Sequence, residues 1–362
     1  MRYDTSFTIG GREIGPDRPT YFIADIASNH DGDLERARAL IWQARDAGAD
    51  AAKFQHFLAE KIVSDYGFRN LDGPLGHQSS WDKPVFEIYK HYEFDRDWNA
   101  VLADEAAKAG IDFMTTPYDA EAIDALRDAV PAFKVGSGDI TWTESLVRIA
   151  RCGKPVLLAT GASTMEDVER AVEAILDHNR QICIMQCNTN YTGDAANFGY
   201  QNLRVLQGFA LRWPGAVLGF SDHTSGHAAV LGAVALGARV VEKHFTDDNG
   251  RSGPDHGFAM NPETWAEMVA RCRELEAALG DGIKRIEDNE RDTIVVQRRC
   301  LRLKRDLKAG AIIAGDDLEA LRPAPPGAIP PWDEGSILGG VLCRDKVAGD
   351  ALNYDDVRVT DA

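Results

Sequence analysis

The chain has 362 residues, of which 44% are hydrophobic and 27% are charged, and its formal net charge is −17. These fractions are typical of a globular protein and exclude disordered and fibrous classes, while the length predicts two domains. The acidic surplus argues against a general binder of nucleic acid or of an anionic membrane, because both ligands repel a negatively charged surface.

Short apolar runs alternate with longer amphipathic ones over residues 1–280. The run at 21–27 predicts a strand, and Asp33 then precedes an amphipathic helix over 34–47 that Gly48 ends. The alternation continues in the same way along the chain. Further strands are predicted at 51–55, 112–116, 132–135, 156–159, 182–186, 217–220 and 240–245, with helices near 98–109, 119–127, 143–151, 165–179, 201–213, 227–236 and 262–279.

Eight strand–helix units within about 260 residues predict a (β/α)8 TIM barrel. The alternative is a doubly wound open sheet, which usually carries a glycine-rich turn after its first strand. Here that turn has the sequence Ser-Asn-His-Asp-Gly at 28–32, which does not match GxGxxG. We therefore expect an α/β fold with a TIM barrel over residues 1–280.

The sequence changes character after Gly280. Residues 281–292 are rich in charge and predict a linker. Residues 293–362 hold short apolar runs separated by turn signals, which predict a small β-rich domain. A domain of about 70 residues is near the lower size limit for independent stability, so we expect it to pack against another surface.

The first residues and the cysteines indicate a compartment. The chain starts Met-Arg-Tyr-Asp, without the apolar core of a signal peptide, and no run approaches the roughly 18 apolar residues that span a bilayer. Its six cysteines include no CxxC pair, so we expect free thiols in a reducing compartment. These features predict a cytoplasmic protein with no membrane partner and no nucleic-acid partner.

Polar side chains occupy inward positions at or just beyond the predicted C-terminal strand ends, where TIM barrels place their active sites. Inward and outward residues alternate along a strand, and the large apolar residues fall mostly on the outward positions. Because an unpaired buried charge is costly, this pattern favours a polar pocket at the barrel mouth. The inward polar residues are Asp25, Lys53, Gln55, Thr116, Lys134, Ser137, Ser221, His223, Glu242 and His244.

Two lysines among these residues suit a phosphate or a carboxylate. The ammonium groups of Lys53 and Lys134 act as point charges, and neighbouring hydroxyls add directional hydrogen bonds. In the structural alternative, Lys134 neutralises Asp25 or Asp139 inside the barrel. The hydroxyls that complete the predicted anion site belong to Thr116, Ser137 and Ser221.

Two histidines end neighbouring strands on the inward side. The imidazoles of His223 and His244 suit a divalent ion such as Mn²⁺, Zn²⁺ or Fe²⁺, and Glu242 is positioned in the sequence to complete the shell directly or through water. The alternative is two unrelated histidines, one of which caps the helix after His223. The pair alone leaves both interpretations open.

Seven motifs, in chain order, resemble those of the sialic acid synthases. The end of the chain resembles the antifreeze-like (SAF) domain of that family, with Arg322-Pro323 and residues 327–330 at its signature loop. The resemblance covers nearly the whole chain. The motifs are IADIASNHDG at 23–32, GADAAKFQ at 48–55, TTPYD at 115–119, KVGSGD at 134–139, SDHT at 221–224, EKHFT at 242–246 and GPDH at 253–256.

The resemblance implies an enzyme that condenses phosphoenolpyruvate with an N-acylated aldose, releases phosphate and forms a nonulosonic (sialic-type) acid. It implies Mn²⁺ or Mg²⁺ held by His223 and His244. It also implies a domain-swapped homodimer in which Arg322 reaches the sugar in the other subunit's pocket. Phosphoenolpyruvate contacts are implied at Lys53, Thr116, Lys134, Ser137 and Ser221, and sugar contacts at Gln55, Tyr191 and Asp255.

The chain departs from the family pattern around the predicted pocket. The family usually has Glu where this chain has Asp25 and Asp139, so each carboxylate is shorter by one methylene, about 1.5 Å. Both are candidate catalytic groups beside Lys53, and Asp25 is placed to steer water or protons. Ala159 stands where the family usually has Ser. The family's asparagine ligand corresponds to Asn188 or Asn190, and the sequence does not decide between them.

Several alternatives remain open at the level of sequence. The shortened carboxylates and Ala159 also suit a non-catalytic sugar-binding protein with an eroded site. A metal-dependent sugar isomerase or aldolase is another alternative, because the barrel hosts many chemistries. The aldose is either N-acetylmannosamine or a diacetamido-trideoxy hexose, and GPDH at 253–256 resembles the sialic and legionaminic branches more than the pseudaminic one.

Overall fold

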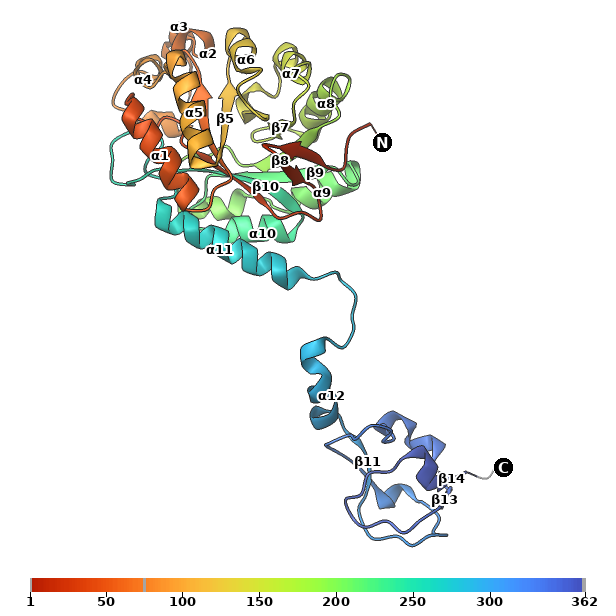
Figure 1. Cartoon of the computed structure of the whole chain (residues 1–362). Coiled ribbons are helices and arrows are strands. Elements are labelled where there is room, and N and C mark those ends of the chain that lie inside the picture. Colours follow the sequence, from red (N-terminus) through yellow and green to blue (C-terminus); the bar gives the residue numbers. More distant parts are fainter. Residues whose placement is uncertain (1, 74–75, 360–362) are drawn as a thin grey trace. The chain divides into compact units, whose positions relative to one another are not determined.

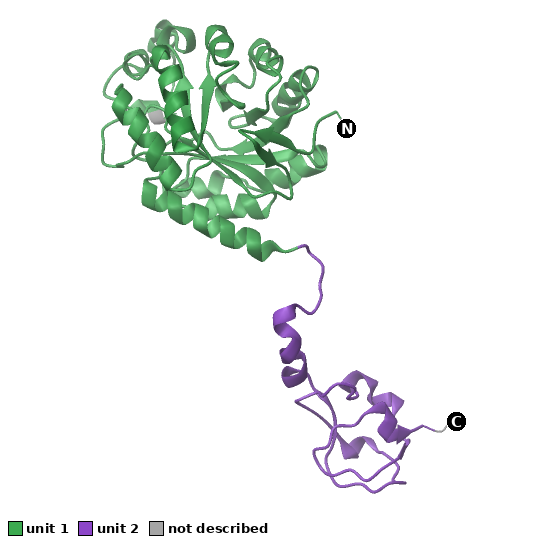
Figure 2. Cartoon of the chain, viewed as in Figure 1, with its two compact units in different colours: residues 1–280 green, residues 281–362 purple. Residues whose placement is uncertain are grey.

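The computed structural model describes residues 2–73 and 76–359 of the chain. The chain divides into two compact units, Met1–Gly280 and Asp281–Ala362, which Figure 2 shows in different colours. The first unit is a barrel of strands surrounded by helices, whereas the second is built from short strands and turns (Figure 1). Within the described ranges, none of the helices combines the length and the apolar character that crossing a membrane requires.

Eight parallel strands of the first unit close into a barrel in the order β10-β3-β4-β5-β6-β7-β8-β9. Strand β10 closes the barrel on β3, with His244 opposite Asp25 at the end of the pair. The predicted TIM barrel is confirmed. The strands are β3 (Tyr21–Asp25), β4 (Ala51–His56), β5 (Asp112–Pro117), β6 (Phe133–Val135), β7 (Val156–Ala159), β8 (Ile182–Cys187), β9 (Val217–Asp222) and β10 (Ala238–His244).

A covering helix follows each barrel strand (Figure 1). The first, α1, shows why these segments are helical. The Asp33 carboxylate caps α1 by accepting hydrogen bonds from two backbone N–H groups, and four apolar residues spaced three or four apart are buried. The covering helices are α1 (Leu34–Asp46), α5 (Asn99–Ala109), α6 (Ala120–Leu126), α7 (Thr143–Ala150), α8 (Met165–Leu176), α9 (Val205–Arg212), α10 (Ala228–Ala235) and α11 (Pro262–Leu279).

The strands divide their residues between two hydrophobic cores. In β3, Tyr21 and Ile23 belong to the core inside the barrel, whereas Phe22 and Ala24 belong to the core between the strands and the helices. The predicted alternation is therefore confirmed. Asp25 is the next inward residue after Tyr21 and Ile23. The same two-residue period therefore places its carboxylate inside the barrel.

Two parts of the first unit were not predicted from the sequence. A hairpin of β1 (Phe7–Ile9) and β2 (Arg12–Ile14) adds apolar side chains to the inner core. Its strands are too short to show a periodic pattern. The second missed part, residues 57–98, we call the β4–α5 excursion. It contains α2 (Ala59–Ile62), α3 (Asp65–Arg69) and α4 (Val85–His91), with short 3-10 turns at η1 (Gly76–Ser80) and η2 (Arg96–Trp98).

The second unit has its own apolar core. Two short antiparallel pairs frame it, β11 (Cys300–Leu303) with β12 (Leu318–Leu321), and β13 (Val341–Leu342) with β14 (Val357–Arg358). The 3-10 turns are η6 (Gly315–Asp317), η7 (Pro331–Ser336) and η8 (Tyr354–Asp356). The core residues are Leu301, Leu303, Leu307, Ile313, Leu318, Ile329, Ile337, Leu342, Leu352 and Val357.

The segment predicted as a linker, residues 281–292, contains the start of a helix. The 3-10 turn η5 (Asp288–Glu290) leads directly into α12 (Arg291–Gln297). No residue of α12 is buried within the described part of the chain, so the helix has no packed apolar face there. Four of its seven residues are β-branched and are weak helix formers, and so short a segment has no amphipathic pattern, which is why the sequence did not indicate this helix.

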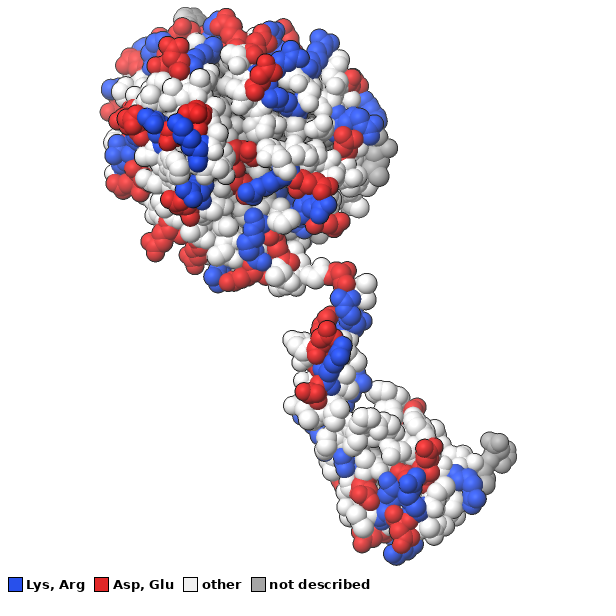
Figure 3. Space-filling view, in the orientation of Figure 1, with Lys and Arg blue, Asp and Glu red and all other residues white. Residues whose placement is uncertain are grey.

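Charges of both signs are interspersed over the visible face of each unit (Figure 3). Many of them pair within one helix, such as Lys108 with Asp104 at 2.6 Å and Arg69 with Asp65 at 2.8 Å. Such exposed pairs add little stability, because water screens them and long side chains lose freedom. The charges that matter for function are those inside the barrel.

Candidate active site

A cavity of about 430 Å³ opens at the C-terminal ends of the barrel strands. Cavities of this size hold small ligands, and this end of a TIM barrel is where such enzymes act. Some predicted site residues are deeply buried on the inward faces of the strands, namely Asp25, Lys53, Thr116, Lys134, Ser221 and His223. Others line the cavity itself, namely Gln55, Ser137, Asp139, Tyr191, His244 and Asp255.

Lys53, on β4, links Asp25 at the end of β3 to Thr116 on β5. Its Nζ lies 2.8 Å from Asp25 Oδ2 and 3.2 Å from Thr116 Oγ1, and Gln55 Nε2 donates to the same carboxylate oxygen at 3.0 Å. Burial disfavours the ionised form of Asp25. Attraction to Lys53 and His244, with these hydrogen bonds, outweighs burial and lowers the pKa of Asp25. Asp25 is therefore a carboxylate at neutral pH.

The turn after β3 carries backbone strain beside this carboxylate. Ala27 has φ +47° and Asp31 has φ +53°, in the left-handed region that residues other than glycine rarely adopt. The Ala27 N–H donates to Asp25 Oδ1 at 3.1 Å, so this backbone shape fixes the carboxylate. Strain of this kind costs about 1–3 kcal/mol per residue and is common at functional sites.

Lys134 binds Glu242 on the opposite side of the barrel. Its Nζ donates to Glu242 Oε1 at 2.9 Å, and Ser221 Oγ donates to the same oxygen at 3.4 Å. Burial disfavours the ammonium, but attraction to Glu242 outweighs it and raises the pKa of Lys134. The structural alternative, in which Lys134 neutralises one of the site's aspartates, is wrong, because Lys53 is the ammonium that pairs with Asp25.

His223 and His244 face each other with ring centroids 5.5 Å apart. The carbonyl of Asn188 accepts a hydrogen bond from His223 Nδ1 at 2.9 Å. Burial disfavours the charged imidazole, but the interactions with Cys187 and with this carbonyl outweigh burial and raise the pKa of His223. A carbonyl acceptor of this kind is the usual support of a metal-binding imidazole. His244 Nδ1 is buried and has no hydrogen-bond partner among the described residues, and its Nε2 lies 3.7 Å from Asp25 Oδ2.

Glu242 Oε1 pairs with Lys134, and the role of Glu242 in a metal shell, directly or through water, stays a prediction. Over residues 2–73 and 76–359, no three His, Cys, Asp or Glu side chains form a group that holds a metal ion. The chain thus offers two imidazoles, of which His223 has a carbonyl oxygen at its Nδ1 and His244 has no hydrogen-bond partner at its Nδ1 among the described residues. This donor set fits an ion that keeps open positions for oxygen ligands, as catalytic ions do.

Asp139 lines the cavity in the 3-10 turn η3 (Ser137–Asp139) after β6. Burial raises the pKa of Asp139 to about 6. The neighbouring Ser137 Oγ accepts a hydrogen bond from the Gly161 N–H at 2.9 Å, which ties this turn to the loop after β7. The site therefore combines an ionised carboxylate at Asp25 with a carboxyl at Asp139 that exchanges its proton near neutral pH.

A hydrogen-bond network holds the loop that carries Asp255. Asp255 Oδ2 accepts from the Ser28 N–H at 3.2 Å, which joins the loop after β10 to the turn after β3. Asp31 joins the same two segments by binding His256 Nε2 at 3.0 Å and Arg251 Nη2 at 2.8 Å. Because His256 is fully buried, these contacts fix the position of Asp255 at the cavity.

The structure distinguishes the two candidate asparagines. Asn190 Oδ1 accepts hydrogen bonds from Thr192 and Asn197 within its own loop. Asn188 instead supports His223 through its carbonyl, and its buried Oδ1 has no hydrogen-bond partner within the described ranges. Asn188 is thus the asparagine at the histidine pair. The ring of Tyr191 packs beside the same histidine, with centroids 4.3 Å apart.

The sequence analysis did not find one side of the cavity. The β4–α5 excursion supplies Phe57, Ile62, Trp81, Tyr89 and Tyr92 to the lining. A signal was present, because the 57–98 connection is long and rich in aromatic residues. Connections longer than about 12–15 residues in a compact domain are usually functional.

Arg322 lies in the second unit, directly after β12 and before Pro323. Its side chain is exposed, so it is accessible to a ligand or to another chain. Its contact with the sugar remains a prediction.

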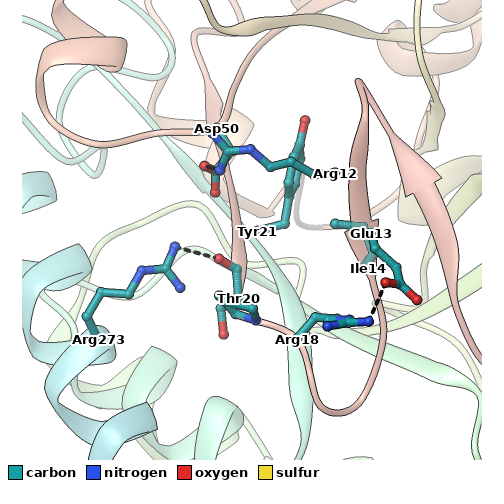
Figure 4. Close-up of a pocket in the computed structure, with 9 residues that line it drawn as sticks. Arg12, Glu13, Ile14, Arg18, Thr20, Tyr21, Asp50 and Arg273 are labelled. Atoms are coloured by element: carbon teal, nitrogen blue, oxygen red, sulfur yellow. Dashed lines mark hydrogen bonds and ion pairs between the residues drawn. The ribbon is translucent and has the colours of Figure 1, made fainter.

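A second cavity, of about 270 Å³, lies at the opposite, N-terminal end of the barrel strands (Figure 4). Thr20 and Tyr21 at the start of β3 line it, together with the hairpin β1–β2 and Arg273 of α11. The Thr20 carbonyl accepts a hydrogen bond from Arg273 Nη2 at 2.9 Å. Each arginine of this cavity is bound to a carboxylate: Arg12 to Asp50, Arg18 to Glu13 and Arg273 to Glu276.

These features define a TIM barrel with two buried lysines and a histidine pair at its mouth, followed by a small C-terminal domain. Residues 40–284 match the NeuB family, and residues 298–358 match the SAF domain. The chain belongs to the NeuB family. The resemblance found in the sequence motifs is thereby confirmed.

Curated relatives and solved structures agree with this membership. The chain is 35% identical to N,N'-diacetyllegionaminic acid synthase of Campylobacter jejuni, over 85% of this chain and 91% of that protein. It is 32% identical to human N-acetylneuraminate-9-phosphate synthase, over 91% of this chain and 90% of that protein. The crystal structure of N-acetylneuraminic acid synthetase from Leptospira borgpetersenii, in complex with citrate, superposes with a TM-score of 0.70 at 28% identity, covering 80% of this chain and 95% of that one.

Proposed function

We propose that this protein condenses phosphoenolpyruvate with an N-acylated aldose to give a nonulosonic acid and phosphate. The observation that carries the proposal is the buried lysine pair, because Lys53 and Lys134 lie inside the barrel below a cavity that fits a small ligand. Both ammonium groups have hydroxyls beside them, from Thr116 and Ser221. The names of the relatives support the same reaction class.

The lysines bind the anionic groups of phosphoenolpyruvate in this proposal. A buried ammonium attracts phosphate or carboxylate strongly, because little water screens the charge. Thr116, Ser137 and Ser221 then supply directional hydrogen bonds from hydroxyls. The charge that develops when phosphate leaves is stabilised by groups already in place.

His223 and His244 would hold the divalent ion, Mn²⁺ or Mg²⁺. When bound, such an ion supplies Lewis-acid polarisation of a carbonyl oxygen. The chain's own part is to orient the rings, which the Asn188 carbonyl does for His223. Gln55 and Asp255 are at the cavity surface and position the sugar.

The carbon–carbon bond forms when the methylene carbon of phosphoenolpyruvate attacks the aldehyde carbon. Water then adds to the oxocarbenium-like C2, the bond from C2 to the phosphate oxygen breaks, and phosphate leaves. Asp25 is ionised and fixed by three hydrogen-bond donors, so it accepts a proton from that water. Asp139 supplies a second proton-exchanging carboxyl at the opposite side of the cavity lining.

The test is phosphate release that depends on both substrates. The protein is incubated with phosphoenolpyruvate, Mn²⁺ and a panel of N-acyl aldoses, and the product mass is measured. The proposal requires equal amounts of phosphate and of an acid heavier than the aldose by the pyruvate unit. Sugar binding without phosphate release indicates the eroded binding protein, and isomerised or cleaved sugar without phosphoenolpyruvate indicates the isomerase or aldolase.

We also propose that the protein is a homodimer in which Arg322 of one copy completes the site of the other. The small size of the second unit and the exposed side chain of Arg322 support this idea. Mixing Arg322→Ala chains with His223→Ala chains at equal amounts restores about a quarter of wild-type activity, because half of the dimers are mixed and each has one intact site. A monomer in solution, or no recovery after proven subunit exchange, contradicts the proposal.

A further inference from the structure

The loop after β10, residues 246–260, closes on itself beside the cavity, and we call it the β10–α11 loop. Its two ends meet, because the Thr246 N–H donates to the Met260 carbonyl at 2.9 Å and the Met260 N–H donates to the His244 carbonyl at 2.8 Å. Loops of this size whose ends lie close together are Ω-loops, which are frequently functional. This one carries Asp255, the carboxylate at the cavity that the proposed function assigns to the sugar.

The β10–α11 loop is fastened to α1 and to the turn after β3. At the start of the loop, Asp247 Oδ2 accepts a hydrogen bond from Arg36 Nη1 of α1 at 2.7 Å. Toward its end, Asp255 Oδ2 accepts from the Ser28 N–H at 3.2 Å, which is the long limit for such a bond. This last contact is therefore a weak attachment by itself, and Asp31 of the same turn supplies a stronger one.

Asp31 binds two different residues of the loop with one carboxylate. Its Oδ2 accepts from Arg251 Nη2 at 2.8 Å and from Arg251 Nε at 3.0 Å, and its Oδ1 lies 3.0 Å from His256 Nε2. Arg36 of α1 also approaches Oδ2, with its Nε at 3.3 Å. The Asp31 side chain is only 19% exposed, so water screens these contacts incompletely. Hydrogen bonds between charged groups are the strong ones, which makes this attachment firm.

His256 transmits the attachment to Asp255, which directly precedes it in the chain. The imidazole is fully buried, and its Nδ1 lies 2.7 Å from Thr246 Oγ1. A Cβ atom at Gly253 would lie 2.7 Å from His256 Cδ2, so the backbone of the loop packs closely against the ring. The ring is thus held in one position, and the backbone of Asp255 is held with it.

The backbone of Asp31 suits this role. Its φ of +53° lies in the left-handed region, which Asp and Asn adopt more readily than other residues with a side chain. Asp31→Asn therefore preserves the turn and changes the side-chain chemistry, because an amide nitrogen cannot accept a hydrogen bond from Arg251. Asp31 is not among the described residues that line the cavity, so its effect on a ligand passes through the loop.

We infer that Asp31 is a positioning residue of the reaction, which holds the β10–α11 loop so that Asp255 stays at the cavity. This inference rests on the proposed function, in which Asp255 binds the aldose and the buried lysines bind phosphoenolpyruvate. Loss of the Asp31 carboxylate weakens the aldose site and spares the phosphoenolpyruvate site, because Lys53 and Lys134 have other partners inside the barrel. A residue that only stabilised the fold would affect both substrates alike.

Steady-state kinetics test this role with the aldose that supports the fastest phosphate release, N-acetylmannosamine or a diacetamido-trideoxy hexose. In Asp31→Asn we expect the KM for the aldose to rise about tenfold and the KM for phosphoenolpyruvate to stay within about twofold, since a small misplacement of a positioning group costs up to about a hundredfold. Asp124→Asn is the matched control, because it breaks a carboxylate–arginine pair between the covering helices α6 and α7, and its kinetics stay at the wild-type level. Equal rises in both KM values, or no rise in either, overturn the inference.

A double-mutant cycle shows whether Asp31 acts through Asp255. Asp255→Ala removes the proposed sugar contact, so the addition of Asp31→Asn to this variant lowers kcat/KM for the aldose by less than about twofold. A further tenfold loss overturns the inference, because Asp31 then acts by another route.

Hydrogen–deuterium exchange tests the loop without any substrate. In Asp31→Asn we expect the amides of residues 246–260 to exchange at least about tenfold faster, with the amides of β10 and α11 unchanged. Unchanged exchange in the loop overturns the inference whether or not the protein is active. If no aldose supports phosphate release by the wild-type protein but exchange responds to the substitution, the proposed function fails, whereas the attachment of the loop by Asp31 is upheld.

Discussion

The two ends of the barrel differ in how their charged and polar groups are paired. At the N-terminal end, Arg12, Arg18 and Arg273 line a small cavity (Figure 4). Each of them binds a carboxylate. At the C-terminal end, polar atoms are buried without hydrogen-bond partners among the described residues, including Glu242 Oε2 and His244 Nδ1. Only Thr20 Oγ1 is in that condition among the described residues that line the other cavity.

This difference separates a structural arrangement from a functional one. Paired charges at the N-terminal end satisfy each other, so they need no ligand. Unpaired polar atoms at the mouth are costly in the absence of a partner, and such atoms persist where a site requires them. The same sequence thus places paired charges at one end of the barrel and unpartnered polar atoms at the other, which is the end where this fold usually carries its active site.

Loss of an imidazole at the mouth has the largest expected effect on activity. We expect His244→Ala and His223→Ala each to lower Mn²⁺-dependent turnover about a thousandfold, because the Lewis-acid contribution amounts to several kcal/mol. Binding of Mn²⁺, measured by calorimetry, weakens in parallel. His178→Ala, which removes an exposed histidine on the outside of the barrel, is the control and leaves both quantities unchanged. Full metal-dependent activity in both mouth variants refutes the assignment.

Loss of a lysine separates catalysis from stability. Lys53→Met leaves Asp25 as a buried charge without its ammonium, so we expect the free energy of unfolding to fall by about 3–5 kcal/mol. We expect kcat/KM to fall about a hundredfold through the lost charge-assisted contact with substrate. The double variant Lys53→Met/Asp25→Asn recovers most of the stability and none of the activity. Urea unfolding and phosphate release measure the two effects.

Asp25→Asn also removes the proposed proton acceptor, so the double variant reports mainly on stability, and only a return of activity bears on the role of Lys53. If activity returns together with stability, Lys53 is a structural partner of Asp25 and the anion site is wrong. Lys108→Met is the control for loss of a lysine from an exposed ion pair, which contributes at most about 1 kcal/mol.

The barrel and the inward positions were predictable from the sequence because they follow from periodicity. A two-residue period in each strand assigns Lys53 and Lys134 to the inside without knowledge of their neighbours. The pairing across the barrel was not predictable in this way. Lys134 on β6 meets Glu242 on β10, and these strands lie opposite each other in the closed sheet. Parity gives the direction of a side chain but not its partner across the interior.

The aromatic residues that the β4–α5 excursion adds to the cavity were missed for a different physical reason. The β4–α5 excursion contains helices of only four to seven residues, and so few turns give no amphipathic stripe. Its rings pack on residues that follow other strands, as Phe57 does on Tyr118. Such contacts depend on the closed barrel, which brings β4 beside β5.

A raised carboxyl pKa at the mouth predicts a pH effect. The pKa of Asp139 is raised to about 6 from an ordinary value of 3.8, so between these pH values the folded chain binds more protons than the unfolded chain. The contribution of Asp139 to the free energy of unfolding is therefore largest at low pH and is lost as the pH rises toward 6. In Asp139→Asn we expect stability not to fall over this pH range. We also expect the change in kcat/KM near pH 6, which reports the pKa of Asp139 in the free enzyme, to be absent.

Thermal unfolding and initial rates between pH 4 and 8 measure both effects of Asp139, with the pH range set around the pKa of about 6. Asp128→Asn makes the same chemical change at an exposed position and keeps the wild-type profiles. Wild-type and Asp139→Asn profiles that superimpose show that the carboxyl titrates in its ordinary range.

The smallest effect is expected at the N-terminal end of the barrel. Arg12 is 58% exposed, whereas the side chain of its partner Asp50 is 6% exposed. In Arg12→Ala, Asp50 keeps the hydrogen bond from the Phe22 N–H at 2.8 Å, so the carboxylate is not left without a partner. We expect the free energy of unfolding to fall by about 1 kcal/mol, at the upper end of the range for a water-screened pair. Activity stays at the wild-type level, because the substitution lies at the opposite end of the barrel from the lysines and histidines.

Arg18→Ala breaks a pair in which both partners are about half exposed, and it costs less than about 0.5 kcal/mol. A marked loss of kcat in Arg12→Ala, with Arg18→Ala unchanged, contradicts the division of the barrel into a stabilising end and a reactive one.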